Sequence, residues 1–155
     1  MIPAGIKLSS FILAIDDEPE FLDVLKEALG SLEYRVRIAM DPGQAIIFYQ
    51  EAWRDVSMVL LDFLMPRMNG DRVLAELQRI NPNVRAVLLS GCPDVPVESM
   101  IQKGLRGYLR KPFTLPQLAK VVRDTVGEAS AQRTIDRAPL PQSPAKPAHR
   151  PRPTV

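Results

Sequence analysis

The chain has 155 residues, of which 46% are hydrophobic and 25% are charged, so it can form one globular domain with a buried core. Residues 1–130 carry 15 Lys/Arg and 17 Asp/Glu, whereas residues 131–155 carry 5 and 1. The single cysteine, Cys92, excludes an intramolecular disulfide and a zinc site made of several cysteines. The sequence lacks both a secretion signal pattern and an apolar run of about 20 residues, so we expect a cytoplasmic protein without a membrane span.

Composition changes toward the end of the chain. Six of the fifteen prolines fall in the last seventeen residues, where basic side chains also outnumber acidic ones. We therefore expect an N-terminal extension at 1–10, a folded domain at 11–127 and a disordered, Pro-rich basic tail at 128–155. Such a tail could contact nucleic acid, an anionic surface or an SH3-like groove, but a solvated linker is the favoured interpretation.

The first third of the domain predicts strand, helix, strand and helix. The apolar run 11–15 is a strand, and 20–32 has helical period. The inner face of this helix is expected to hold Phe21, Leu22, Leu25 and Leu29. The segment 34–40 alternates as a half-exposed strand does, and Asp41 followed by Pro42 predicts the start of the second helix.

The rest of the domain repeats this alternation. Strands are expected at 56–61, 84–89 and 107–110. Helices are expected after Gly70, at 95–104 and at 114–127, the last of them ending at Gly127. Five strands alternating with five helices indicate an α/β fold with a doubly wound parallel sheet.

Polar side chains follow four of the five predicted strands. They are Asp16 and Asp17 after the first strand, Asp62 after the third, Ser90 after the fourth and Lys111 after the fifth. A doubly wound sheet binds its ligands beyond the carboxyl ends of the strands, where the strand order reverses. We therefore expect these five side chains to share one crevice.

The three carboxylates in this crevice require a cation. Two of them 4 Å apart repel each other by about 4 kcal/mol at an effective dielectric constant near 20. Ligands that are all oxygen favour a hard ion, so Asp16, Asp17 and Asp62 predict a site for Mg²⁺ or Mn²⁺. Lys111 and Ser90 are suited to hold phosphoryl oxygens beside the metal, and carboxylates such as Asp62 can form aspartyl-phosphates.

Four short motifs now indicate a family. They are "IDDE" at 15–18, "LLDFLMPRMNG" at 60–70, "LLSG" at 88–91 and "YLRKPF" at 108–113. Together, and in this order, they resemble the receiver domain of response regulators in two-component signalling, over residues 11–127. The resemblance implies a flavodoxin-like fold with strand order 2-1-3-4-5.

The resemblance also implies the chemistry. Asp62 would accept a phosphoryl group from a sensor histidine kinase or a histidine phosphotransfer protein. Mg²⁺ would be held directly by Asp17, Asp62 and the backbone carbonyl of Leu64, and by Asp16 through water. Only phosphotransfer and weak self-dephosphorylation are expected, so the chain would not be a conventional enzyme.

A conformational switch follows from the same resemblance. Lys111 would pair first with Asp62 and then with the phosphoryl oxygens, and its bond to Pro112 would be cis. Ser90 would move toward the phosphoryl group and Tyr108 would turn inward. The surface formed by the fourth helix, fifth strand and fifth helix would then change its packing, bind a partner or form a homodimer.

Two departures from the family pattern and two alternatives remain, and one of the departures is Cys92, two residues after Ser90. Leu64 stands where many members have a polar side chain that orients water, which predicts slow to moderate self-dephosphorylation.

A receiver-like interaction module that is never phosphorylated is one alternative. An aspartate-nucleophile phosphohydrolase is the other, although Leu64 replaces its general acid. No DNA-binding or other output motif follows Gly127 in this sequence, so the output and the cognate kinase stay open.

Overall fold

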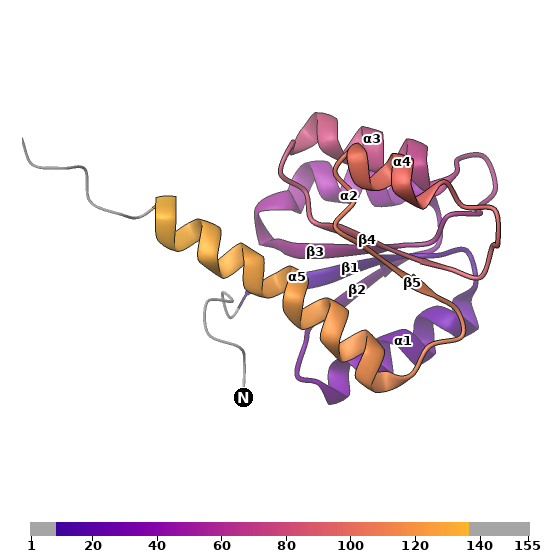
Figure 1. The fold of residues 1–155 in the computed structure, drawn as a ribbon, viewed down its shortest axis with the longest axis horizontal. Helices are drawn as coiled ribbons and strands as arrows, with labels where there is room; N and C mark the ends of the chain where they lie inside the picture. Colours follow the sequence, from indigo (N-terminus) through magenta and orange to yellow (C-terminus); the bar gives the residue numbers. More distant parts are fainter. Residues whose placement is uncertain (1–8, 137–155) are drawn as a thin grey trace, which may run out of the picture.

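The computed structural model describes residues 9–136, which form a five-stranded parallel sheet flanked by helices (Figure 1). The elements in chain order are β1 (Phe11–Ile15), α1 (Pro19–Ser31), β2 (Val36–Ala39), α2 (Pro42–Ala52), the 3₁₀ turn η1 (Trp53–Asp55), β3 (Val56–Leu61), α3 (Gly70–Ile80), β4 (Ala86–Ser90), α4 (Val97–Gln102), β5 (Gly107–Arg110) and α5 (Leu115–Asp136). The strand order is β2-β1-β3-β4-β5, which confirms the predicted doubly wound, flavodoxin-like sheet.

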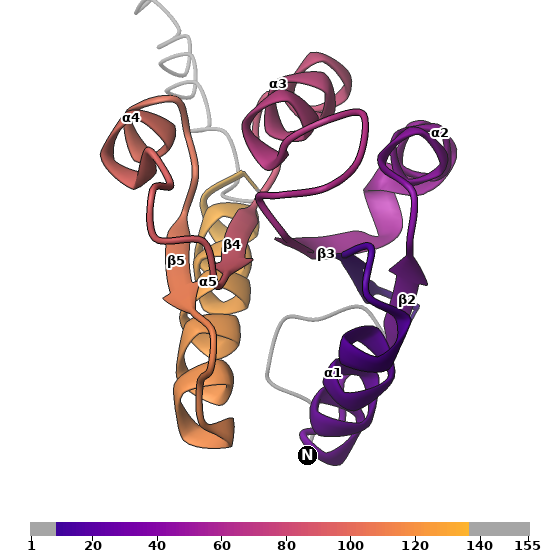
Figure 2. The ribbon, with the colours of Figure 1, turned by 90° about the vertical axis from the view of Figure 1, so that its right-hand side faces the viewer.

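Helices cover both faces of this sheet and bury a core on each side. In Figures 1 and 2, α1 and α5 lie side by side on one face, while α2, α3 and α4 lie on the other. Strands β1, β3 and β4 are almost entirely buried, as expected for the centre of a parallel sheet, whereas β2 is half exposed at its edge. The three central strands therefore hold the residues at their carboxyl ends in fixed positions.

The helices follow the predicted apolar faces. Helix α1 buries Leu22, Leu25 and Leu29, and α3 buries Val73, Leu74 and Leu77. The Asp41 side chain accepts a hydrogen bond from the Gln44 backbone N–H, which confirms it as the cap of α2.

The C-terminal helix differs from the prediction. Helix α5 continues to Asp136, so the predicted end at Gly127 is wrong and residues 128–136 are helical. Glycine within a helix costs only about 1 kcal/mol relative to alanine, which does not end a helix by itself. The remainder of the predicted tail, 137–155, and residues 1–8 of the predicted N-terminal extension lie outside the described residues.

Strand ends also shift by one or two residues. Strand β2 begins at Val36, because a turn occupies the residues before it. In this turn Glu33 has φ 67°, and the Tyr34 N–H donates to the Leu29 carbonyl. Strand β4 extends through Ser90, so this side chain belongs to the strand and not to the loop after it. Within residues 9–136, none of the helices combines the length and apolar character that a membrane crossing requires.

Candidate functional site

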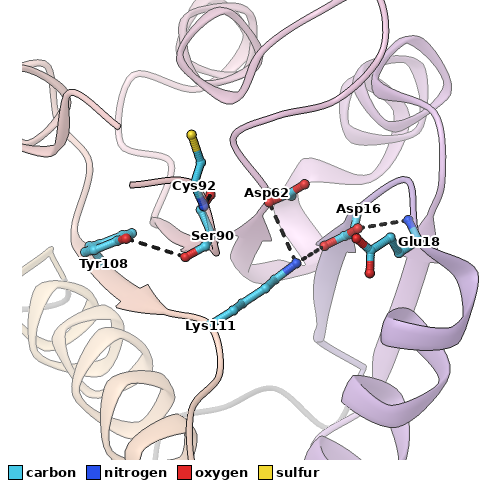
Figure 3. Close-up of polar contacts among 7 residues, drawn as sticks. All are labelled: Asp16, Glu18, Asp62, Ser90, Cys92, Tyr108 and Lys111. Atoms are coloured by element: carbon cyan, nitrogen blue, oxygen red, sulfur yellow. Dashed lines mark hydrogen bonds and ion pairs between the residues drawn. The ribbon is translucent and has the colours of Figure 1, made fainter. Parts of the chain in front are cut away.

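The backbone of the sheet brings the predicted acids together. Ile15 and Leu61 are register partners at the ends of β1 and β3, and the Asp62 N–H donates to the Ile15 carbonyl at 2.9 Å. The Asp16 N–H donates to the Ala39 carbonyl at 3.2 Å, which continues the β1–β2 ladder. Both aspartates are thus fixed by strand pairing, and their side chains leave the sheet at the same edge (Figure 3).

Lys111 reaches into this edge from the end of β5 and lies between the two acids (Figure 3). Its Nζ is 2.7 Å from Asp16 Oδ2 and 3.7 Å from Asp62 Oδ1. The Asp16 side chain is 3% exposed and that of Lys111 is 18% exposed, so water screens the pair only weakly. In this state, therefore, the ammonium is bound mainly to Asp16 and only loosely to Asp62.

The Asp62 carboxyl has a pKa well above its ordinary value. Burial, together with the negative charge of Asp16, raises the pKa of Asp62 to about 6, against the opposing effect of Lys111. Asp16 is better compensated, because its other oxygen also accepts from the Glu18 backbone N–H at 2.9 Å. The site therefore contains one stabilised carboxylate and one that lacks sufficient positive charge.

A divalent cation would supply the positive charge that the carboxylates of the site lack. Asp16, Asp17 and Asp62 each place a carboxylate oxygen within 4.8 Å of the other two. Asp17 is exposed while the other two are buried, so the cluster is open to solvent on one side. Three carboxylates without sulfur or imidazole ligands are the donor set of a hard ion such as Mg²⁺, and an open side leaves room for its waters.

Ser90 connects the end of β4 to the residues around it. Its Oγ accepts a hydrogen bond from the Cys92 N–H at 3.1 Å, and its carbonyl accepts from the Lys111 N–H at 3.0 Å. The Tyr108 hydroxyl donates to the same carbonyl at 3.4 Å (Figure 3). The Lys111–Pro112 peptide bond is cis, the geometry that the resemblance implied.

The loop between β3 and α3 brings Gly70 against the backbone of Asp62 and Phe63. The Gly70 N–H donates to the Phe63 carbonyl at 2.7 Å, and a Cβ on Gly70 would lie 2.5 Å from the Asp62 carbonyl oxygen. Only glycine allows this approach, so Gly70 shapes the backbone that carries Asp62. The Leu64 side chain on this loop is 61% exposed.

Two residues of the site were not identified as such from the sequence. Gly70 was expected only to precede a helix, and Phe21 only to pack on the inner face of the first helix. The Phe21 ring does pack against the core, and its centroid also lies 3.7 Å from Lys111 Nζ. The position of Phe21 in the first turn of α1, just after the acid pair, is the one signal in the sequence that it lies near the site.

Comparison with known proteins agrees with the geometry. Residues 12–123 match the family described as response regulator receiver domain. The sensor kinase CckA of Brucella abortus is 31% identical over 117 residues, which cover 75% of this chain and 12% of that protein. The transcriptional regulatory protein ZraR of Klebsiella oxytoca is 29% identical over 136 residues, covering 86% and 29%. The chain thus spans less than a third of the length of these two relatives.

Solved structures show the same fold. A response regulator receiver domain protein from Clostridium thermocellum is 26% identical with a TM-score of 0.76, covering 79% of this chain and 98% of that one. NtrX from Brucella abortus, solved in complex with ATP, has a TM-score of 0.76 at 24% identity and covers 91% and 32%. At this identity the second likeness concerns the fold alone.

Proposed function

The chain belongs to the response regulator receiver domain family, and from this premise we propose that it is a signalling switch phosphorylated on Asp62. The observation that carries the proposal is the buried Asp62 carboxylate, which lies beside the Lys111 ammonium and within 4.8 Å of two further carboxylates, Asp16 and Asp17. An ordinary structural ion pair would need neither the extra acids nor the open side.

The proposed reaction transfers a phosphoryl group from a phosphohistidine. An Asp62 oxygen attacks phosphorus, the P–N bond breaks, and the imidazole leaves with its electron pair and takes up a proton. The product is an acyl phosphate, and water later hydrolyses it to restore the carboxylate and release phosphate. Lys111 and the Ser90 hydroxyl would hold the oxygens of the transferred group, because both can donate to a phosphate.

Mg²⁺, or Mn²⁺ in its place, fits the donor set described above. Asp16, Asp17, Asp62 and the backbone carbonyl of Leu64 would hold it. When bound, the ion would supply positive charge that neutralises the carboxylates and the phosphoryl oxygens. With Asp16 serving as one of the residues that hold the ion, the Lys111 ammonium would be able to pair with the phosphoryl oxygens.

The proposed switch runs through Ser90. Phosphorylation adds about −1.5 to −2 charge and three strong acceptors at one point. A rotation of the Ser90 hydroxyl toward them would break its bond to the Cys92 N–H. The Ser90 carbonyl accepts from the Tyr108 hydroxyl and from the Lys111 N–H, so a shift of the Ser90 backbone that accompanies this rotation would reach β5 through both bonds. The α4-β5-α5 surface would then favour one of two packings.

The partners follow from this role. We expect a sensor histidine kinase or histidine phosphotransfer protein as donor, in the cytoplasm, and a protein or attached output domain that binds the α4-β5-α5 surface. A second copy of the chain could also occupy that surface.

Phosphodonor labelling tests the proposal. The purified chain, incubated with acetyl phosphate or phosphoramidate and Mg²⁺, should gain the mass of one phosphoryl group, and chelation of the metal should prevent the gain. Asp62→Asn should gain nothing, whereas Asp23→Asn, at an exposed position on α1, should behave as the unaltered chain. Equal labelling of Asp62→Asn and the unaltered chain would disprove the proposed acceptor.

A further inference from the structure

An aromatic ring forms the third contact of the Lys111 ammonium. The Phe21 centroid is 3.7 Å from Lys111 Nζ, well within the roughly 6 Å over which a ring attracts a cation. The other two cation–ring contacts described are longer, 4.6 Å for Arg54 over Trp53 and 5.9 Å for Arg37 over Phe11. The ammonium is thus held by two carboxylates and one aromatic face.

The ring is itself held in place. Phe113, which follows the cis peptide bond, meets Phe21 edge to face, with centroids 6.1 Å apart and planes at 84°. Both rings pack against the apolar core between α1, α5 and the sheet. Phe21 therefore joins the first turn of α1 to the β5–α5 connection, and one face of the ring is presented to Lys111.

The ring matters because the carboxylate contacts of Lys111 are not permanent. In the proposed function, Asp16 would help to hold a divalent ion and Asp62 would become an acyl phosphate, so the ammonium would exchange its 2.7 Å contact with Asp16 for a contact with the phosphoryl group. A long lysine side chain released into water has many rotamers, and ordering it again costs free energy. The aromatic face is the one contact of the three that does not change chemically during this exchange.

We propose that Phe21 is a positioning residue, whose ring keeps the Lys111 ammonium at the site while it passes from Asp16 to the phosphoryl group. The role given to Phe21 in phosphoryl transfer rests on the proposed function. The contact between the Phe21 ring and Lys111 is observed independently of that function. It predicts that the electrostatic strength of the ring face, and not only its volume, sets the rate of phosphoryl transfer to Asp62. A purely structural Phe21 would be sensitive to volume alone.

A fluorination series separates these two cases. Phenylalanines with one, two and three ring fluorines, incorporated at position 21, weaken the cation–ring attraction progressively with little change in shape. We expect the rate of phosphorylation by phosphoramidate to fall at each step, by about threefold to fivefold over the series. Phe21→Tyr should stay near the unaltered rate and Phe21→Leu should fall at least as far as the trifluorinated ring. The matched control is the same series at Phe48, whose ring contacts Phe11 at 5.6 Å.

A second readout does not depend on phosphorylation. The NMR signal of the Lys111 ammonium, recorded on the unphosphorylated chain, is visible only while its protons exchange slowly with water. Exchange should quicken with each fluorine at position 21 and stay constant in the Phe48 series. A flat exchange series would overturn the inference, as would phosphorylation rates that fall in Phe21→Leu but not along the series. If exchange is graded while even the unaltered chain gains no phosphoryl group, the positioning of Lys111 stands and the proposed function fails.

Discussion

Two lysine–aspartate pairs with the same separation show what burial does to an ion pair. Lys111–Asp16 at the edge of the sheet and Lys120–Asp124 on the outer side of α5 both have Nζ–Oδ2 distances of 2.7 Å. The first pair has side chains 18% and 3% exposed, and the second 72% and 56%. Distance alone therefore does not distinguish a functional pair from a surface pair; the cost of leaving a buried charge unpaired does.

The largest expected effect comes from removing one lysine of each pair. Lys111→Met leaves two buried carboxylates without their cation, so the free energy of unfolding at pH 8 in a chelator should fall by about 2–4 kcal/mol. Lys120→Met should leave it unchanged within error. Urea denaturation of both variants measures the difference. If the two variants lost equal stability, burial would not be what distinguishes these pairs.

The loop that carries Asp62 offers the next test. Gly70→Ala places a Cβ 2.5 Å from the Asp62 carbonyl oxygen and should lower the free energy of unfolding by about 2–3 kcal/mol, since backbone must move. Gly30→Ala, at an exposed position in α1 with open space around it, should raise it by about 0.5–1 kcal/mol. Thermal unfolding of both proteins provides the measurement. Equal changes in the free energy of unfolding for Gly70→Ala and Gly30→Ala would show that the loop backbone moves at little cost.

The raised pKa of Asp62 predicts an effect on stability that depends on pH. Its native pKa of about 6 lies above the ordinary 3.8, so the native state holds the proton more tightly and stability falls as pH rises between these values. Without metal, Asp62→Asn should therefore be more stable than the unaltered chain by up to about 3 kcal/mol above pH 6, since each pKa unit corresponds to about 1.4 kcal/mol. The difference should vanish below about pH 4. Stability curves that stay parallel across this range would contradict the raised pKa.

The smallest effect concerns the lifetime of the phosphorylated state. Leu64 is exposed beside Asp62 but cannot orient water, so the phosphoryl group should be lost slowly to moderately fast. Leu64→Asn supplies an amide at this place and should speed the loss by about threefold to tenfold, a modest gain from positioning one water. Decay of the phosphorylated mass after donor removal measures it. Loss from the unaltered chain within seconds would contradict the account of Leu64.

Much of this could be predicted from the sequence, because the information is local. The bounds of β1, β3 and β5 follow from short apolar runs, and the polar residues directly after them mark the carboxyl edge. Parallel pairing then brings Asp16 to Asp62 without any further assumption. What could not be predicted depends on distant contacts: the ring of Phe21 under Lys111, the approach of Gly70 to the Asp62 carbonyl, and the preference of Lys111 for Asp16.

The C-terminal helix shows a different limit. Glycine is common just after the end of a helix, so Gly127 predicts such an end. Its cost inside a helix is only about 1 kcal/mol relative to alanine, which does not decide where a long helix ends. The predicted boundary at 128 therefore relied on composition, and the helix runs on to Asp136.

Chemical mapping of the phosphorylated residue shows whether Asp62 is the phosphoryl acceptor. Borohydride reduces an aspartyl-phosphate to homoserine, so peptide sequencing by mass spectrometry after phosphorylation and reduction identifies the acceptor. We expect homoserine at position 62 and unchanged aspartate at positions 16 and 17. Homoserine at either of those acids, with Asp62 intact, would contradict this expectation.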